Sequence, residues 1–305
     1  MTSERTEEEH LIGWVVAKRR ALLADFLVRL VKEKPMGTFG AVIVMIMLLT
    51  AIFAGVLAPY GMNRISLADR LEGPSAEHFL GTDNLGRDLF SRIIHGARIS
   101  IYVGLGASFL SAFGATIIGL ISGFIGGKTD VIIQRFVDAW MCFPGLVIFL
   151  TVLSIVGPGL VQVILVLGVS ASIGSSRVVR SAVMNVKENL YVQAAMSIGA
   201  STSSIIVRHI LPNIIAPVII IFTLGIGGMI LAEATLSFLG LGIPAPTPSW
   251  GGMLSGSGRT YMVKAPWMAI WPGLSLVIVI YSINMLGDAV RDLLDPRLRG
   301  GSGRY

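Results

Sequence analysis

Residues 214–241 read IIAPVIIIFTLGIGGMILAEATLSFLGL, and Glu233 is the only charged residue in this stretch. A helix of about 20 mostly apolar residues is long enough to cross the hydrocarbon core of a bilayer. Because that core contains no water, the backbone polar groups must be satisfied within the segment itself, which favours a helix. The stretch therefore predicts a membrane-spanning helix and places the chain among helical membrane proteins.

Five further apolar runs accompany this stretch, at residues 36–60, 100–125, 139–156, 160–176 and 267–286. Gly157-Pro158-Gly159 forms a tight turn between the third and fourth runs of the chain, so these two are expected to form an antiparallel hairpin. Of the 305 residues, 53% are hydrophobic and 14% are charged, and the mean hydropathy is +0.77. Soluble domains carry about 25% charged residues. The expected fold is an all-α integral membrane protein with six transmembrane helices.

The positive charges predict the orientation of these spans. With the N-terminus inside, 17 of the 24 Lys and Arg residues fall in inner segments and seven in outer segments. Such an excess is typical of cytoplasmic loops. Both termini and residues 177–213 are therefore predicted to be cytoplasmic, and residues 61–99 form an external loop. The net charge of +6 is explained by this bias, and no nucleic-acid partner is expected.

The N-terminal residues are expected to lie along the membrane instead of crossing it. Residues 10–34 carry apolar side chains at helical spacing and charged ones on another face, and Pro35 ends the pattern. This is typical of an amphipathic helix in the inner membrane interface, with a cytoplasmic helix packed on a partner as the alternative. The chain is thus divided into a cytoplasmic N-terminal segment, 1–35, and a six-span domain, 36–305.

No segment carries a pattern typical of catalysis or of cofactor binding. Residues 122–129, SGFIGGKT, lack the first glycine of a phosphate-binding loop and follow an apolar span instead of a strand. The single cysteine, Cys142, and the four histidines show no metal-ligand spacing. We predict no catalytic residue, cofactor site or metal site in this chain. If ATP drives the protein, another chain binds it.

The inner segment 177–213 has a helical pattern of its own. Residues 186–198 favour a helix, Gly199 stands where a left-handed cap is expected, and a second helix is predicted to run from there until Pro212 ends it. The bend is made of small residues and of candidate N-caps: Ala194, Ala195, Gly199, Ala200, Ser201, Thr202 and Ser203. Small residues can enter a groove on a partner without steric clash. From the residues alone, a docking element and a plain connecting loop are equally good interpretations.

This segment resembles the EAA signature of ABC importer permeases, in which E-A-A is followed after three residues by G and after nine more by I-x-L-P. The matching positions are Ala194, Ala195, Gly199, Leu211 and Pro212. Gln193 stands where the family has an acidic residue, and His209 stands where it has isoleucine. The resemblance implies that the segment docks onto a separate ATPase through Gln193, Ala194, Ala195, Gly199, Ala200, Ser201, His209, Leu211 and Pro212.

Other stretches resemble a particular subunit type. Residues 79–92, FLGTDNLGRDLFSR, are similar to the segment that enters the second span of peptide and nickel importer permeases. Residues 233–242, EATLSFLGLG, and 288–297, DAVRDLLDPR, resemble the C-type subunit of the dipeptide, oligopeptide and nickel group, as does the N-terminal helix. The resemblance covers nearly the whole chain beyond residue 30. It implies the type I ABC importer permease fold and a di- or oligopeptide cargo, with nickel or another small solute as the alternative.

The same resemblance implies a set of partners and a location. Family members combine two homologous permease subunits, here an expected heterodimer, with two ATP-binding subunits and an external solute-binding protein. ATP and Mg²⁺ are expected on the ATP-binding subunits, and the complex is expected in the bacterial cytoplasmic (inner) membrane. Transport is expected to proceed by alternating access. A secondary transporter subunit is a weaker alternative, because the chain shows no clear internal repeat and few intramembrane charges.

Two further features of the sequence are each open to two interpretations. The outer motif is either a structural cap over the mouth of the bundle or a docking surface for the external binding protein; its residues are Gly81, Thr82, Asp83, Gly86, Arg87 and Asp88. Glu233 lies toward the outer end of its span and either lines a pathway or gate or pairs structurally, since a charge at mid-bilayer costs roughly 2.5–3.5 kcal/mol. Arg135 and Asp138 are three residues apart and are expected to pair within one helix.

Overall fold

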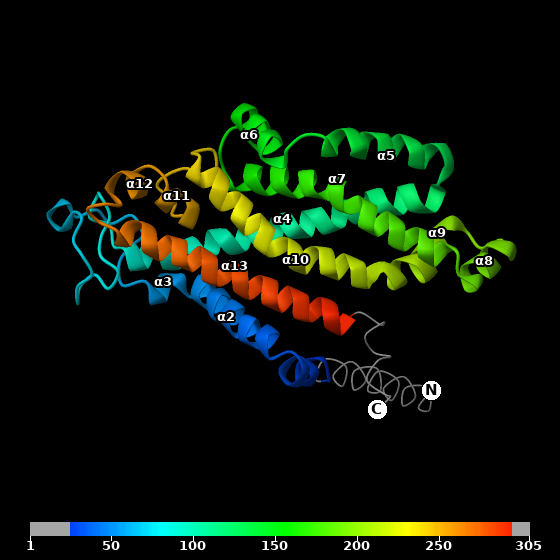
Figure 1. The fold of residues 1–305 in the computed structure, drawn as a ribbon, viewed down its shortest axis with the longest axis horizontal. Helices are drawn as coiled ribbons and strands as arrows, with labels where there is room; N and C mark the ends of the chain where they lie inside the picture. The colour runs from blue at the N-terminus through cyan, green and yellow to red at the C-terminus, as the bar shows by residue number, and fades with distance from the viewer. Residues whose placement is uncertain (1–24, 295–305) are drawn as a thin grey trace, which may run out of the picture.

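A computed structural model describes residues 25–294, which form a bundle of long helices (Figure 1). The long helices are α2 (Pro35–Ile52), α4 (Leu89–Ile125), α7 (Leu160–Lys187), α10 (Leu211–Phe238) and α13 (Trp267–Leu294). All five are long and apolar enough to cross a membrane, α10 together with the turns that precede it. Within the described residues the regular elements are helices, and Thr82 and Asp88 form an isolated β-bridge. The predicted all-helical membrane fold is confirmed.

The predicted span 139–156 is not one straight helix. It crosses the end of α5 (Gly127–Met141) and all of α6 (Gly145–Val156), and these two helices are bent by 88°. Pro144 has no N–H to donate and disfavours a helical conformation at Phe143, so the chain leaves the helix at this point. Six spans are therefore reached only when the bent pair counts as one. Hydropathy reported the apolar length of this region correctly but not its change of direction.

Three predicted spans are longer in the structure, because polar residues at their ends are helical too. α4 begins at Leu89 instead of residue 100, α7 continues beyond residue 176 to Lys187, and α13 continues beyond residue 286 to Leu294. With 37 residues, α4 is about 55 Å long and exceeds the roughly 30 Å hydrocarbon core. The polar first turns of α4 were assigned to the external loop 61–99, which is shorter than predicted.

The first predicted span, 36–60, is interrupted at Phe53. α2 ends at Ile52 and a short helix, α3 (Ala54–Leu57), follows it. The guanidinium of Arg98 on α4 donates from Nε to Ala51 O at 2.5 Å and from Nη2 to Ile52 O at 3.0 Å. This arginine therefore supplies partners for carbonyls that the end of α2 leaves free.

Glycines bring α4 and α7 into close contact. A Cβ at Gly119 would lie 2.7 Å from Val179 Cβ and 2.8 Å from the backbone nitrogen of Arg180, and Gly123 is similarly close to Val183. Gly127 continues the four-residue spacing but has a φ of 54°, and its Cβ would meet nothing within 4 Å. The packing stripe therefore consists of the first two glycines, and Gly127 instead shapes the turn into α5.

Ion pairs tie α5 to α7. Arg180 donates to both carboxylate oxygens of Asp130, and Arg177 pairs with Asp138. Arg135 Nη1 lies 3.8 Å from Asp138 Oδ2, so the predicted pair within α5 is present, but the shorter contact comes from Arg177 on the neighbouring helix. These two carboxylates of α5 are thus paired with arginines of a neighbouring helix.

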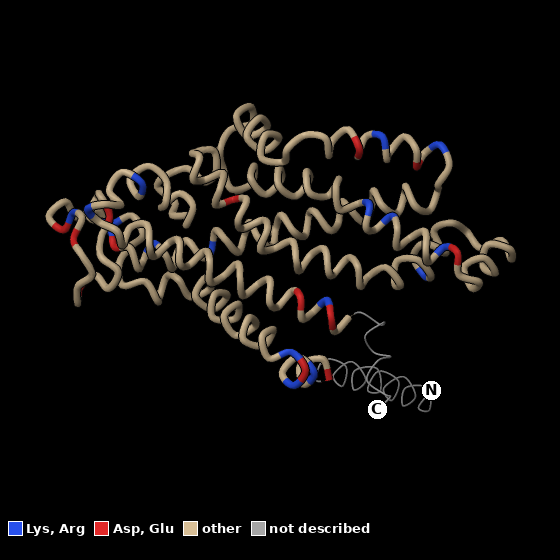
Figure 2. Tube along the Cα trace, in the orientation of Figure 1, with Lys and Arg blue, Asp and Glu red and all other residues tan. Residues whose placement is uncertain are grey.

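The charged residues gather toward the two ends of the bundle (Figure 2). One end, here called the loop end, carries residues 58–88 and the segment 239–266, which includes α11 (Trp250–Leu254) and α12 (Ser257–Tyr261). The other, the α8 end, carries residues 188–210 with α8 (Leu190–Ser197) and α9 (Thr202–Ile205) (Figure 1). The start of α2 and the end of α13 also point toward the α8 end (Figure 1).

Most of the predicted N-terminal amphipathic helix lies outside the described residues, although residues 25–33 are helical. The C-terminal part of the stretch 288–297 also lies outside them beyond Leu294. Lys34 Nζ lies 2.5 Å from Asp292 Oδ2, which joins the start of α2 to the last turns of α13.

The α4–α7 contact leads to a stability prediction. Gly119→Ala places a methyl group against Val179 and the α7 backbone, and overpacking of this kind costs about 1–3 kcal/mol. Gly174→Ala on α7 is the matched control, because its Cβ would meet nothing within 4 Å and alanine is the better helix former. Thermal unfolding of the purified protein in detergent should show a lower midpoint for Gly119→Ala and an unchanged or higher one for Gly174→Ala. Equal midpoints for the two variants would contradict the close contact.

Candidate functional site

The α8 end is held to the bundle by a small apolar cluster. On α8, Val192 is fully buried and Ala195 nearly so, and both pack in one cluster with Val183 of α7 and with Ile205 and Ile210. Two buried side chains on one short helix fix its position but leave the rest of its surface free. The predicted segment 177–213 is therefore partly the end of α7 and partly a separate helical element.

Gly199 turns the chain after α8. Its φ is 78°, its N–H donates to Met196 O at 3.0 Å, and the N–H of Ala200 donates to Ala195 O at 3.1 Å. These two bonds are those of a Schellman cap, which requires a left-handed residue at this place. The positive φ predicted for Gly199 is confirmed. Its Cβ would meet nothing within 4 Å, so the requirement for glycine comes from the backbone conformation alone.

The second predicted helix does not end at Pro212. Ser201 accepts from Ser204 N at 3.3 Å and starts α9, which passes through a π-helical turn, η2 (Ile206–Ile210), directly into α10. Pro212 lies inside this continuous helical run, directly after the π-helical turn. The prediction that Pro212 breaks the helix was wrong, because the hydrogen-bond pattern changes in η2 immediately before the proline and the chain stays helical through it.

The predicted docking residues differ in how far they are exposed in the structure. Gln193, Ala194, Gly199, Ser201 and Pro212 are exposed, Ala200, His209 and Leu211 are half-buried, and Ala195 is buried. Gln193 Nε2 donates to Glu188 O at 3.1 Å, and the ring of His209 lies 6.1 Å from the ring of Tyr191. The two positions that differ from the family pattern therefore have contacts within the segment.

Sequence reasoning missed the exposed apolar residues of this end. Leu190 is 83% exposed and Ile198 is 84% exposed, and Tyr191 and Val207 are also exposed. Large apolar side chains beyond the spans have no lipid tails to contact, and such groups commonly mark a binding surface. Their presence in a segment outside the predicted spans is the signal that was available in the sequence.

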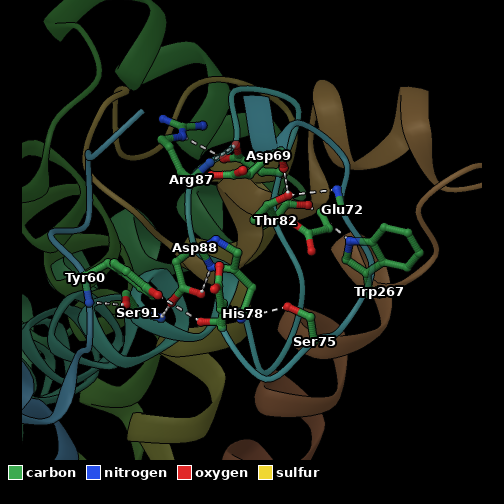
Figure 3. Close-up of polar contacts among 12 residues, drawn as sticks. Tyr60, Asp69, Glu72, Ser75, His78, Thr82, Arg87, Asp88, Ser91 and Trp267 are labelled. Atoms are coloured by element: carbon green, nitrogen blue, oxygen red, sulfur yellow. Dashed lines mark hydrogen bonds and ion pairs between the residues drawn. The ribbon is translucent and has the colours of Figure 1, made fainter. Parts of the chain in front are cut away.

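At the loop end, the outer motif forms a network of hydrogen bonds (Figure 3). Asp83 is buried and accepts from Leu85 N at 2.8 Å and from Arg87 N at 3.0 Å, while Arg87 Nε donates to its other oxygen at 2.7 Å. Asp88 caps α4 by accepting from Ser91 N at 2.7 Å. Arg87 and Asp88 thus pair with other residues and not with each other.

Asp88 has a second partner that the sequence did not suggest. Its Oδ1 lies 2.9 Å from His78 Nδ1, and both side chains are almost completely buried. The ring of His78 in turn lies 5.0 Å from the ring of Tyr60, whose N–H donates to Ser91 Oγ (Figure 3). This chain of contacts ties the segment after α3 to the start of α4.

Close backbone approaches explain the glycines of the motif. A Cβ at Gly86 would lie 1.7 Å from Ser66 O, and one at Gly81 would lie 2.7 Å from Glu72 O. Both glycines have positive φ. Trp267, at the start of α13, donates from Nε1 to Thr82 O at 3.1 Å, and Thr82 Oγ1 contacts both Asp69 O and Glu72 N. The motif therefore closes this end of the bundle by contacts to α4 and α13.

Glu233 is fully buried in α10 near the loop end. Its Oε1 accepts from Ser237 Oγ at 2.6 Å, and Ser237 Oγ accepts from Ile243 N at 3.0 Å. Ser237 thereby links Glu233 to the segment that follows α10, where Gly240, with a φ of 87°, ends the helix. In the structure Glu233 has no exposed surface, and its carboxylate is bonded to Ser237 at the end of α10.

Two family models match the chain. Residues 115–300 match the binding-protein-dependent transport system inner membrane component, and residues 22–74 match the N-terminal transmembrane domain of oligopeptide transport permease C. The first match contains α8, the bend at Gly199 and most of the spans. The second contains α2 and α3.

Named relatives cover most of the chain. It is 40% identical over 268 residues to the dipeptide transport system permease protein DppC of Alkalihalophilus pseudofirmus, with 88% of each chain covered. It is 38% identical over 270 residues to the glutathione transport system permease protein GsiD of Escherichia coli, covering 88% of this chain and 89% of the relative. A putative peptide transport system permease protein of Brucella suis is 41% identical over 259 residues, with 84% and 87% covered.

A solved structure shares the fold. A chain of the methionine ABC transporter MetNI, determined in inward-facing conformations, matches with a TM-score of 0.51 at 18% identity. The match covers 67% of this chain and 96% of that chain. This likeness supports the arrangement of the helices alone.

The close packing of the outer motif at the loop end predicts that Gly86 cannot be replaced by a larger residue. Gly86→Ala puts a methyl group into Ser66 O on a backbone of positive φ, so the two parts of the loop around residues 66 and 86 must move apart. Gly73→Ala, in the same loop, is the matched control, because its Cβ would meet Trp267 at an ordinary 3.8 Å. Protease cleavage within residues 58–88 of the protein in membranes should be faster in Gly86→Ala and unchanged in Gly73→Ala. Full protection of Gly86→Ala would show that the loop is not packed as described.

Glu233 provides a second prediction at this end. Glu233→Gln keeps an oxygen that accepts from Ser237 and should accumulate in the membrane like the wild type. Glu233→Ala leaves a cavity and removes the acceptor, and should lower the amount of folded protein. Quantifying the protein by size-exclusion chromatography, together with uptake, separates the roles. Normal accumulation of Glu233→Gln with lost uptake would place the carboxylate on the pathway. Normal accumulation and normal uptake of Glu233→Ala would exclude both the pathway role and the structural role.

Proposed function

The chain belongs to the family of binding-protein-dependent transport system inner membrane components, and on that premise we propose how it works as the permease subunit of an ATP-driven importer. The chain forms one half of a pathway across the membrane, and a second, homologous permease subunit forms the other half. The exposed apolar surface of its spans is available to lipid and to that subunit. Peptides are the proposed cargo, because the relatives named above are dipeptide, glutathione and putative peptide permeases.

The proposed ATPase-docking element is α8 with the bend that follows it. The observation that supports this role is the exposure of Leu190 and Ile198, at 83% and 84%, on a helix that is anchored to the bundle by Val192 and Ala195. An apolar surface of this kind gains free energy when a partner covers it. Gly199 and Ala200 form a bend with small side chains, so the surface of a partner can come close to the backbone there.

Movement of the docking element is transmitted through its two connections to the spans. On one side, Val192 and Ala195 pack on Val183 of α7. On the other side, α9 and η2 join α10 without an intervening loop. A displacement of α8 driven by closure of the ATP-binding subunits therefore reaches two of the spans directly. We propose that ATP binding opens the pathway outward and that hydrolysis returns it to the inward-facing state.

The nucleotide chemistry is proposed to reside on the partners. ATP and Mg²⁺ are held by two ATP-binding subunits, and this chain contributes docking residues but no catalytic residue. The α8 end then faces the cytoplasm of a bacterial cell, as do the start of α2 and the end of α13, and both termini are cytoplasmic. This orientation agrees with the excess of Lys and Arg in the inner segments.

The loop end is proposed to face an external solute-binding protein. Its outer motif is internally bonded, so its role there is to hold a fixed surface and not to supply free polar groups. Exposed side chains of the same loop, Ile65 and Leu67 among them, are available for the contact itself.

The docking role predicts that Gly199 controls coupling. Gly199→Val forces a β-branched residue into a φ of 78° and should displace Ala200 and α9 while all spans remain apolar and insertable. The expected result is a protein that reaches the membrane but retains less ATPase on co-purification and loses uptake. ATP hydrolysis by the complex should no longer respond to the cargo-loaded binding protein.

Gly199→Asn is the matched control, because asparagine tolerates the left-handed conformation and the position has open space. It should keep most of the ATPase binding and uptake. If Gly199→Val retains full ATPase binding and full uptake, residues 186–212 are not the coupling element.

A further inference from the structure

A cleft of about 550 Å³ lies between the corner where residues 25–33 meet α2 and the last turns of α13. Its back is closed by direct helix contact. A Cβ at Gly37 would lie 2.2 Å from Ala289 Cβ, and one at Gly40 would lie 2.4 Å from Ser282 O. The two helices thus touch at these glycines, and the cleft opens beside that contact. None of the roles proposed above uses it.

The cleft is charged on one side and uncharged on the other. Glu33, Lys34, Asp288 and Asp292 line the charged side, whereas Met36, Tyr281, Asn284 and Met285 line the uncharged side. Both walls change character at the same level: α2 carries no charged residue from Pro35 to Ile52, and α13 carries none from Trp267 until Asp288. The boundary between hydrocarbon and headgroups therefore passes through the cleft.

The groups of the charged side are unevenly matched. Lys34 Nζ lies 2.5 Å from Asp292 Oδ2, and Glu33 Oε1 lies 3.0 Å from Arg29 Nε. Asp288 is exposed and forms no ion pair with any residue between 25 and 294. The cleft therefore presents one unpaired carboxylate beside a lysine, and three carboxylates to one ammonium in total. Because Lys34 is already paired with Asp292, the unpaired charge in the cleft is negative, and it fits a ligand that carries a cation and disfavours a purely anionic one.

We propose that this cleft binds a phosphatidylethanolamine molecule of the surrounding bilayer. The primary ammonium of the headgroup donates to Asp288, and an acyl chain follows Met36 and Met285 toward the hydrocarbon core. Phosphatidylcholine carries the same charges, but its quaternary ammonium has no N–H to donate, so it binds less well. Phosphatidylglycerol is anionic and has no cation for Asp288. The proposal needs only that the chain spans a membrane, and not the importer mechanism.

The test compares these three lipids, with identical acyl chains, on the delipidated complex in detergent. Native mass spectrometry should show tighter binding of phosphatidylethanolamine than of the other two. Asp288→Asn should weaken that binding about two- to fivefold, as for a partly exposed ion pair. Asp25→Asn removes an exposed carboxylate outside the cleft and should change nothing. Asp288→Lys should reverse the preference toward phosphatidylglycerol.

Equal binding of the three lipids by the wild type overturns the proposal, as does unchanged phosphatidylethanolamine binding by Asp288→Asn. Native mass spectrometry also reports whether the variants remain assembled, so a folding defect is distinguished from a lost lipid site. Because lipid binding is measured without uptake or ATP hydrolysis, failure here does not bear on the docking role of α8. Conversely, a failed docking experiment leaves the lipid site standing.

Discussion

A peptide group inside a bilayer has no water to bond, so each interruption of a membrane helix needs a partner for the backbone groups that it frees. This constraint explains features of the chain that are distant in sequence. Arg98 reaches from α4 to the carbonyls at the end of α2, and Asp88 caps the start of α4. At the end of α10, Gly240 is left-handed, and the N–H groups of Gly240 and Leu241 bond to Ser237 O and Leu236 O. The breaks are placed where such partners exist, and most of them lie near the two ends of the bundle.

The two ends meet this constraint in opposite ways, and the difference matters for function. At the loop end, Asp83, Asp88 and Trp267 bond to neighbouring segments, which makes a fixed cap. At the α8 end, α8 is held by two buried side chains and leaves Leu190 and Ile198 exposed. A fixed cap suits a surface against which an external protein is oriented. A lightly anchored helix with exposed apolar groups suits a moving contact with a partner that supplies the driving energy.

Between the ends, polar residues are accommodated by pairing between helices. Asp130 with Arg180 and Asp138 with Arg177 hold α5 beside α7, and the close contact at Gly119 holds α7 beside α4. α4, α5 and α7 therefore form one packed unit, and the α8 cluster is attached to it. The cleft beside α2 and α13 lies outside this unit, and there the ion pair of Lys34 with Asp292 joins the two helices.

The sequence by itself determined the class of the protein and the left-handed turn that follows α8. Long apolar runs can be stable only as membrane helices, and the positive φ of Gly199 follows from local helix-ending chemistry, so both were predictable without a fold. The tertiary structure alone decided the rest. Whether the polar residues of 89–99 and 177–187 are loop or helix depends on partners such as Asp130, which are distant in sequence. Likewise, the burial of Glu233, the pairing of His78 with Asp88 and the bend at Pro144 depend on which helices lie side by side. A hydropathy average takes residues in the order of the chain. A buried polar group, in contrast, is stabilised by contacts with residues that are distant in the sequence.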